Sequence, residues 1–173
     1  MKKKKNDFLA VLLLTLIVFI SVVALTLTDG VTREKIEIAQ KDAVAEMLAS
    51  LFPTMEDFTY EQKADKYVAL ADGQEVGQAF MAEGSGYGGP ISILVGIETD
   101  GSLRGIEIIS HLETPGLGAK ITDPAFLDQF KGTLRDELAL SANGGSIDAI
   151  TGATISSSAV VTAVKEATDR WEP

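Results

Sequence analysis

Asp148-Ala149-Ile150-Thr151-Gly152-Ala153-Thr154 leads directly into a helical pattern at residues 155–171. The apolar run 147–150 predicts a short strand, and Gly152 predicts a tight turn after it. Apolar residues then recur along one stripe of the predicted helix, as expected for a helix that packs against a core. Strand, glycine turn and helix therefore meet at Thr154, and we expect them to be part of an α+β domain.

The start of the predicted helix also suits an anion. The first backbone N–H groups of a helix have no partner within it, and the positive end of the helix dipole lies there, so the position favours a phosphate. Thr154 adds a hydroxyl at this point, and Ser156, Ser157 and Ser158 follow in the first turn. These residues equally fit ordinary helix capping and solvation, because Ser and Thr are common caps and Gly is a common turn residue. On the residues alone, both interpretations remain open.

A second informative segment is Glu113-Thr114-Pro115-Gly116-Leu117-Gly118. Pro115 biases Thr114 towards an extended backbone, and the Pro-Gly pair favours a tight turn. The segment therefore predicts a narrow, preset ledge of the kind that a planar ligand requires.

Residues 148–154 resemble the motif Asp-x-x-Ser/Thr-Gly-Ala-Thr, at which two kinds of FMN-binding domain are flavinylated: the G subunit of Rnf complexes and the C subunit of sodium-translocating NADH:quinone reductases. Residues 110–118, Ser-His-Leu-Glu-Thr-Pro-Gly-Leu-Gly, are similar to a second segment of that family and follow the family's order. The resemblance implies covalent FMN, attached through a phosphoester to Thr154 by a flavin transferase that uses FAD. Thr151 occupies a position where Ser is common, so two hydroxyls lie three residues apart.

Other cofactor-binding residues are expected from the resemblance, apart from Ser156, which is expected from its place in the first helical turn, and Lys120, which is expected from its charge. In the C-terminal segment these are Asp148, Thr151, Gly152, Ala153 and Ser156, and in the other segment His111, Glu113, Thr114, Pro115, Gly116, Leu117, Gly118 and Lys120. We expect Gly152 and Ala153 to leave room for the phosphate, and Thr114 and Leu117 to contact the flavin ring. The charge of Asp148 would repel a phosphate, so its expected role is recognition by the modifying enzyme.

Two of these residues have alternative roles. His111 is expected either to hydrogen-bond the flavin ring and tune its potential or to serve the structure alone. Lys120 is expected either to stabilise an anionic reduced flavin or to be a surface charge. No catalytic residue and no metal ligand is expected in this chain.

The N-terminal region predicts a membrane anchor. Phe8–Leu27 is uncharged throughout, and a helix of this length spans about 30 Å, the thickness of a bilayer core. A cleaved signal peptide is the alternative, but its apolar region is shorter and is followed by small residues at a cleavage site. The lysines Lys2–Lys5 place the N-terminus in the cytoplasm and the C-terminal domain outside, so we expect a single-pass protein of the cell (inner) membrane.

The expected organisation follows from this anchor. Residues 1–7 are a cytoplasmic basic tail, residues 8–27 a transmembrane helix in the lipid bilayer, residues 28–52 a juxtamembrane amphipathic helix and residues 53–173 an extracytoplasmic FMN-binding domain. Within that domain, strands are predicted at Lys66–Ala71, Gln74–Ala82, Ile91–Glu98 and Leu103–Ser110. Asp72-Gly73 and Asp100-Gly101 predict turns between strands, and residues 83–89 predict a flexible glycine-rich loop. Asp123 and Pro124 predict a helix start, with Phe126, Leu127 and Phe130 on its apolar side. The expected fold is an antiparallel sheet flanked by helices.

Composition narrows the classes of function. The 173 residues carry a formal charge of −10, and residues 28–173, with 11 basic and 24 acidic residues, carry −13, which should repel nucleic acid. The chain has no Cys and one His, which excludes disulfides, thiolate metal sites and a multi-histidine site within it. Redox chemistry here therefore needs an organic cofactor or a partner's metal.

The resemblance implies an electron-transfer subunit of an Rnf-type ion-translocating ferredoxin:NAD oxidoreductase, a translocase in which this flavoprotein works beside other membrane subunits. Three alternatives remain open: a freestanding membrane-anchored flavin reductase, a subunit of an NADH:quinone reductase, and a non-enzymatic anchored binding module.

Overall fold

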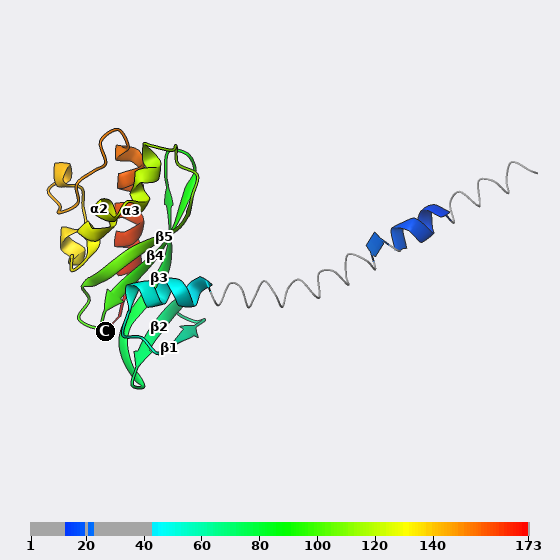
Figure 1. The fold of residues 1–173 in the computed structure, drawn as a ribbon, viewed down its shortest axis with the longest axis horizontal. Helices are drawn as coiled ribbons and strands as arrows, with labels where there is room; N and C mark the ends of the chain where they lie inside the picture. Colours follow the sequence, from blue (N-terminus) through cyan, green and yellow to red (C-terminus); the bar gives the residue numbers. More distant parts are fainter. Residues whose placement is uncertain (1–12, 20, 23–42, 173) are drawn as a thin grey trace, which may run out of the picture. The chain divides into compact units, whose positions relative to one another are not determined.

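The computed structural model describes residues 13–19, 21–22 and 43–172 (Figure 1). The chain divides into two units, one ending at Val44 and the other beginning at Ala45. Residues 13–19 and 21–22 are helical. The predicted basic tail, most of the predicted transmembrane helix and residues 28–42 lie outside the described residues. Within the described ranges, no helix has the length and apolar character needed to cross a membrane.

The second unit is built on a five-stranded antiparallel sheet in which each strand pairs with the next along the chain (Figure 1). The strands are β1 (Asp57–Glu61), β2 (Lys66–Ala71), β3 (Gln74–Ser85), β4 (Pro90–Glu98) and β5 (Leu103–His111). The predicted antiparallel sheet is confirmed. β1 was not predicted, and β3 continues through Glu83–Ser85, for which the sequence predicted a loop.

Tight turns reverse the chain between neighbouring strands of the sheet. Asp72 and Gly73 both have positive φ, 52° and 73°, as a type I′ hairpin turn requires, so this prediction is confirmed. The Asp100-Gly101 turn is also confirmed, with the Gly101 N–H donating to the Glu98 carbonyl over 3.0 Å. Between β3 and β4 the chain turns tightly at residues 86–89, closed by a 2.9 Å bond from the Gly86 N–H to the Gly89 carbonyl.

One face of the sheet is covered by α3 (Thr154–Thr168), which contacts β3 and β4. Phe80, Ile93 and Val95 from these strands are fully buried with Val160 and Val164 of the helix. A side chain at Gly84 would lie only 2.6 Å from the Ala159 carbonyl oxygen, so glycine allows α3 to pack directly against the end of β3. The C-terminal helix is thereby fixed close to the β3–β4 turn.

The opposite face is covered by residues 45–51, the end of a helix that is described from residue 43 and ends before Pro53 as predicted. Leu48, Leu51 and Phe52 are buried there. The Phe52 ring occupies the space that a side chain on Gly77 of β3 would need. Residues 45–52 therefore pack with the sheet in the same compact unit.

The segment between β5 and α3 is made of short helical turns: η1 (Gly118–Thr122), α2 (Pro124–Leu127), η2 (Asp128–Phe130), η3 (Arg135–Glu137) and η4 (Ser141–Asn143). Asp123 is the residue before α2, as predicted, but its side chain makes no capping hydrogen bond. Phe126 and Phe130 are buried edge to face with ring centres 5.4 Å apart, which confirms their predicted place in the core.

The strand predicted at residues 147–150 is wrong. Ile147 makes a single parallel bridge to Leu140, and the pairing goes no further. The next backbone groups bond to side chains instead: the Asp148 N–H donates to Gln129 Oε1 and the Ile150 N–H donates to Ser157 Oγ. The segment is held by these hydrogen bonds, but beyond the bridge at Ile147 it is not part of a strand.

Candidate functional site

Thr154 is the first residue of α3, and its side chain is exposed. The residue before it, Ala153, has no side-chain oxygen to cap the helix. The first intrahelical bond of this end runs from the Ser157 N–H to the Ala153 carbonyl. The N–H groups of Thr154, Ile155 and Ser156 precede that bond and have no acceptor within the helix, which is the arrangement that binds an anion at a helix start.

A tight turn leads into this helix. The Ala153 N–H donates to the Ile150 carbonyl over 2.9 Å, and Gly152 lies at φ +81°, a conformation that favours glycine. The buried Ser157 hydroxyl ties the two ends of the turn together, since it accepts from the Ile150 N–H and donates to the Ala153 carbonyl, each over 3.0 Å. The position of Thr154 is thus set by local hydrogen bonds.

The Thr-Pro-Gly-Leu segment forms the second tight turn, as predicted. The Leu117 N–H donates to the Thr114 carbonyl over 3.2 Å, with Pro115 and Gly116 between them and Gly116 at φ +78°. This is the geometry of a type II turn, in which Pro precedes a residue of positive φ. The turn leaves Leu117 half exposed.

A cavity of about 450 Å³ joins the two segments. Its lining residues are Tyr87, Glu113, Thr114, Leu117, Gly118, Gly152, Ala153, Thr154, Ile155 and Ser156. Eight of these are among the expected site residues. The fold therefore brings both sequence segments to one hollow, with the start of α3 at its edge.

Six expected residues lie outside this lining: His111, Pro115, Gly116, Lys120, Asp148 and Thr151. Asp148, Thr151 and Lys120 are exposed, and Pro115 and Gly116 form the outer part of the turn. The His111 ring accepts a hydrogen bond at Nδ1 from the Glu113 N–H over 3.2 Å, which favours the structural alternative for this residue.

Ser156 lines the cavity but does not offer a free hydroxyl. It is buried, and its Oγ donates to Glu113 Oε2 over 2.7 Å. This bond to a carboxylate occupies the hydroxyl that one of the two open interpretations of Ser156 assigned to a phosphate. Ser158 is exposed and lines a neighbouring hollow.

Two lining residues were missed as site residues. Tyr87 is 74% exposed and Ile155 is 57% exposed, so both present apolar surface beside Thr154. The glycine-rich surroundings of Tyr87 were a usable signal, since glycines allow a backbone to approach a flat ligand. Nothing in the sequence distinguished Ile155 from a core residue of the helix.

A second hollow, of about 620 Å³, borders Thr154 and Ile155 on the other side. Its walls are residues 83–85 of β3 and the exposed face of α3, including Thr162 and Glu166. The two carboxylates, Glu83 and Glu166, make this hollow less suited to a phosphate than the first.

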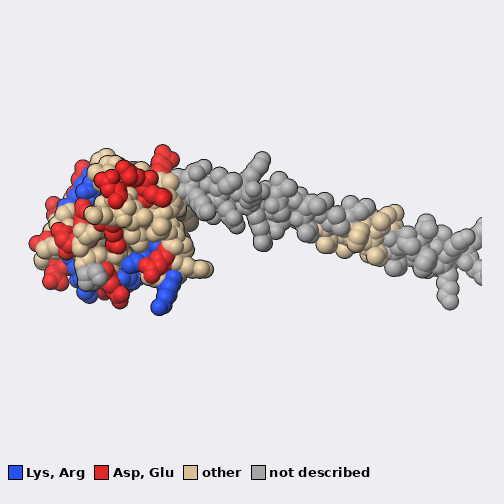
Figure 2. All heavy atoms as spheres, turned by 90° about the horizontal axis from the view of Figure 1, so that it is seen from below, with Lys and Arg blue, Asp and Glu red and all other residues tan. Residues whose placement is uncertain are grey.

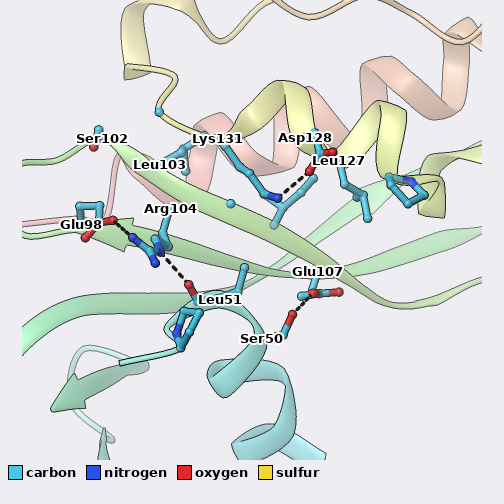
Figure 3. Close-up of a pocket in the computed structure, with 15 residues that line it drawn as sticks. Ser50, Leu51, Glu98, Ser102, Leu103, Arg104, Glu107, Leu127, Asp128 and Lys131 are labelled. Atoms are coloured by element: carbon cyan, nitrogen blue, oxygen red, sulfur yellow. Dashed lines mark hydrogen bonds and ion pairs between the residues drawn. The ribbon is translucent and has the colours of Figure 1, made fainter. Parts of the chain in front are cut away.

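A further hollow of about 470 Å³ lies on different elements, between residues 50–53, β5 and the α2–η2 segment (Figure 3). Its cations are paired: Arg104 with Glu98 at 2.8 Å and Lys131 with Asp128 at 2.5 Å. None of the expected site residues lines it. In the view of Figure 2, acidic side chains are spread widely over the compact unit, in keeping with the acidic composition.

Comparison with known proteins agrees with the geometry. Residues 86–169, which contain both segments of the cavity, match the family model of the FMN-binding domain. The chain is 36% identical over 171 residues to the G subunit of the ion-translocating oxidoreductase complex of Methanosarcina acetivorans, covering 91% of both chains. It is 41% identical over 111 residues to the G subunit of the proton-translocating ferredoxin:NAD(+) oxidoreductase complex of Clostridium ljungdahlii, covering 62% of this chain and 60% of that protein.

Among solved structures, the C subunit of the Na(+)-translocating NADH-quinone reductase of Parabacteroides distasonis is similar, with a TM-score of 0.50 and 28% identity. The match covers 61% of this chain and 59% of that one. The cavity, the FMN-binding domain match and the relative from Methanosarcina acetivorans agree, and this chain belongs to the FMN-binding domain family, among the G subunits of ion-translocating oxidoreductase complexes.

Proposed function

We propose that this chain is the covalent-FMN electron-transfer subunit of an Rnf-type ion-translocating ferredoxin:NAD oxidoreductase complex. The observation that carries the proposal is the cavity of about 450 Å³, in which the Glu113–Gly118 turn and the Gly152–Thr154 turn meet. The names of its relatives among the G subunits give the complex and its reaction class.

The attachment residue that we propose is Thr154. Its hydroxyl is exposed at the start of a 15-residue helix whose preceding residue is Ala153, so the first N–H groups are open to a phosphate. Thr151 is also exposed, but it lies outside the cavity lining. These positions favour Thr154 over Thr151 as the attachment residue.

The residues present fit the ring of the cofactor. The volume lies within the usual range of small-molecule sites, and Tyr87, Leu117 and Ile155 supply apolar surface. Thr114 and the backbone of Gly118 and Gly152 supply polar groups at the wall. When bound, FMN supplies the electron-transfer chemistry, while the chain attaches the cofactor, orients it and partly excludes water.

The proposed attachment has a physical rationale. A phosphate held only by helix-start dipoles would work against the formal charge of −13 on residues 28–173, and an ester removes that requirement. It also prevents loss of the cofactor outside the cell. We further propose residues 8–27 as the membrane anchor, with the N-terminus cytoplasmic, the domain extracytoplasmic and a flavin transferase for maturation.

The test is expression of the full chain with a flavin transferase, followed by a denaturing gel viewed for flavin fluorescence. Peptide mass analysis should place the adduct on Thr154, and Thr154→Ala should lose it while Thr151→Ala keeps it. A chain without fluorescence would favour an anchored binding module, and an adduct on Thr151 would refute the assignment.

The complex is tested separately. In the native host, the chain should copurify with other membrane subunits and with ferredoxin:NAD activity. A flavinylated chain that purifies alone and reduces a small substrate would instead indicate a freestanding reductase. Copurification with quinone-reducing activity would indicate a subunit of an NADH:quinone reductase.

A further inference from the structure

Glu113 is a buried carboxylate in the wall of the proposed flavin cavity. Its side chain follows the end of β5, and the residue is 6% exposed. Oε1 accepts from the Gly88 N–H over 3.0 Å, and Oε2 accepts from the Ser156 hydroxyl over 2.7 Å. Among the described residues, no Lys, Arg or His forms an ion pair with it.

The two bonds join segments that are distant along the chain. Gly88 lies in the turn between β3 and β4, and Ser156 lies in the first turn of α3, 43 residues after Glu113. Tyr87 is adjacent to one bonded residue and Ile155 to the other, and both line the cavity. The carboxylate therefore connects the two walls that carry the apolar surface of the site.

The surrounding backbone leaves space for this carboxylate. A side chain at Gly86 would collide with Glu113 Oε1, and one at Gly118 would collide with Oε2 and lie 2.9 Å from Ser156 Oγ. Two glycines from separate segments thus give room to one buried acid. Burying a carboxylate is costly unless it is hydrogen-bonded, so this arrangement indicates a specific role.

We propose, on the basis of the function above, that Glu113 is a positioning residue of the flavin site that both braces the cavity and lowers the reduction potential of the flavin. The brace acts through the bonds to Gly88 and Ser156, which hold Tyr87 and the start of α3 in place. The potential is lowered because a nearby negative charge raises the free energy of the reduced, more electron-rich flavin. Burial limits the screening of this charge by salt.

Three variants separate the two roles. Glu113→Gln removes the charge and keeps the shape, because its carbonyl oxygen still accepts from the Gly88 N–H and its amide donates to Ser156 Oγ. Glu113→Asp keeps the charge but is one carbon too short for both bonds. Asp136→Asn is the matched control, since Asp136 is an exposed acid in η3, outside the cavity.

The potential of the flavinylated full chain is measured by redox titration. Glu113→Gln should have a more positive midpoint potential than the wild type, whereas Asp136→Asn should not differ from it. An unchanged potential in Glu113→Gln, with the flavin attached, would overturn the electrostatic role and leave the proposed function intact.

The structural role of Glu113 is tested in protein without flavin, by the rate of hydrogen exchange of the Gly88 amide, which donates to Glu113 Oε1. Glu113→Asp should exchange severalfold faster than the wild type, and Glu113→Gln should remain close to it. Equal exchange in the wild type and Glu113→Asp would overturn the brace. Absence of flavin from the wild type would refute the proposed function instead, and the exchange experiment would still test the brace.

Discussion

Ser157 Oγ accepts a hydrogen bond from the Ile150 N–H at 3.0 Å, so the first turn of α3 holds the extended segment that leads into it. The same hydroxyl donates to the Ala153 carbonyl. One fully buried side chain therefore closes the turn that carries Gly152 and presents Thr154. The contact is local, and it explains why this turn keeps its form without a strand ladder.

Ser157→Ala should lower the free energy of unfolding by about 1–3 kcal/mol, because the Ile150 N–H would be left without its acceptor. The fraction of chain that is flavinylated should fall with it. Chemical denaturation and gel fluorescence measure the two effects. Ser158→Ala, at an exposed position of the same turn, should change neither. Unaltered stability in Ser157→Ala would show that the turn is held by other contacts.

Gly118→Ala and Gly116→Ala should have different consequences. At Gly118 a side chain would meet the Glu113 carboxylate and Ser156, so we expect a loss of about 1–3 kcal/mol from overpacking and reduced flavin attachment. At Gly116 the space is open but φ is +78°, so we expect a backbone penalty of roughly 1–2 kcal/mol and normal attachment. Thermal unfolding together with flavin fluorescence tests both, and equal attachment in the two variants would count against the cavity.

Phe52→Ala should destabilise the compact unit by about 3–5 kcal/mol, since the ring is 2% exposed and fills the space above Gly77. The measurement is the denaturant midpoint of unfolding. Ala49→Ser, at an exposed position of the helix that precedes Phe52, is the control. A small effect at Phe52 would mean that residues before Pro53 contribute little to the domain.

Asp100 should titrate below the ordinary pKa of an aspartate, because the Ser102 hydroxyl and N–H both donate to its carboxylate. A lowered folded-state pKa contributes stability above the unfolded pKa, and that contribution is lost as the pH falls through the folded value. Ser102→Ala removes one donor and should raise the pKa of Asp100 towards its usual range. A carboxyl NMR titration of both proteins decides this, and identical curves would refute it.

Much of the fold was predictable because the relevant signals are local. β2 has the predicted bounds, the Asp-Gly turns lie where expected, and α3 begins one residue earlier than predicted. Alternating apolar residues and turn chemistry produce these elements directly. β1 was not predicted, although Phe58 and Tyr60 alternate with polar residues; four of its five residues are exposed, and it lies at the sheet edge.

The site was predictable as two segments but not as a set of contacts. The Pro-Gly and Thr-Gly turns formed as expected because their backbone preferences are intrinsic. The bond between Ser156 and Glu113 joins residues 43 positions apart, and only the packing of α3 against the end of β3 determines it. For the same reason, the sequence did not indicate that Lys120 would lie outside the cavity lining, and the glycines around Tyr87 gave only a general signal that this residue lies near a ligand.

Because α3 follows all five strands in the chain, the cavity is completed only when this last helix docks. The sheet is a simple succession of neighbouring strands, so it can assemble while the chain is still being synthesised. The cavity requires residues from both Tyr87 and Ser156, so it is complete only after the last helix docks. With the cofactor attached as proposed, a nascent or truncated chain without α3 would lack this cavity and would carry no flavin.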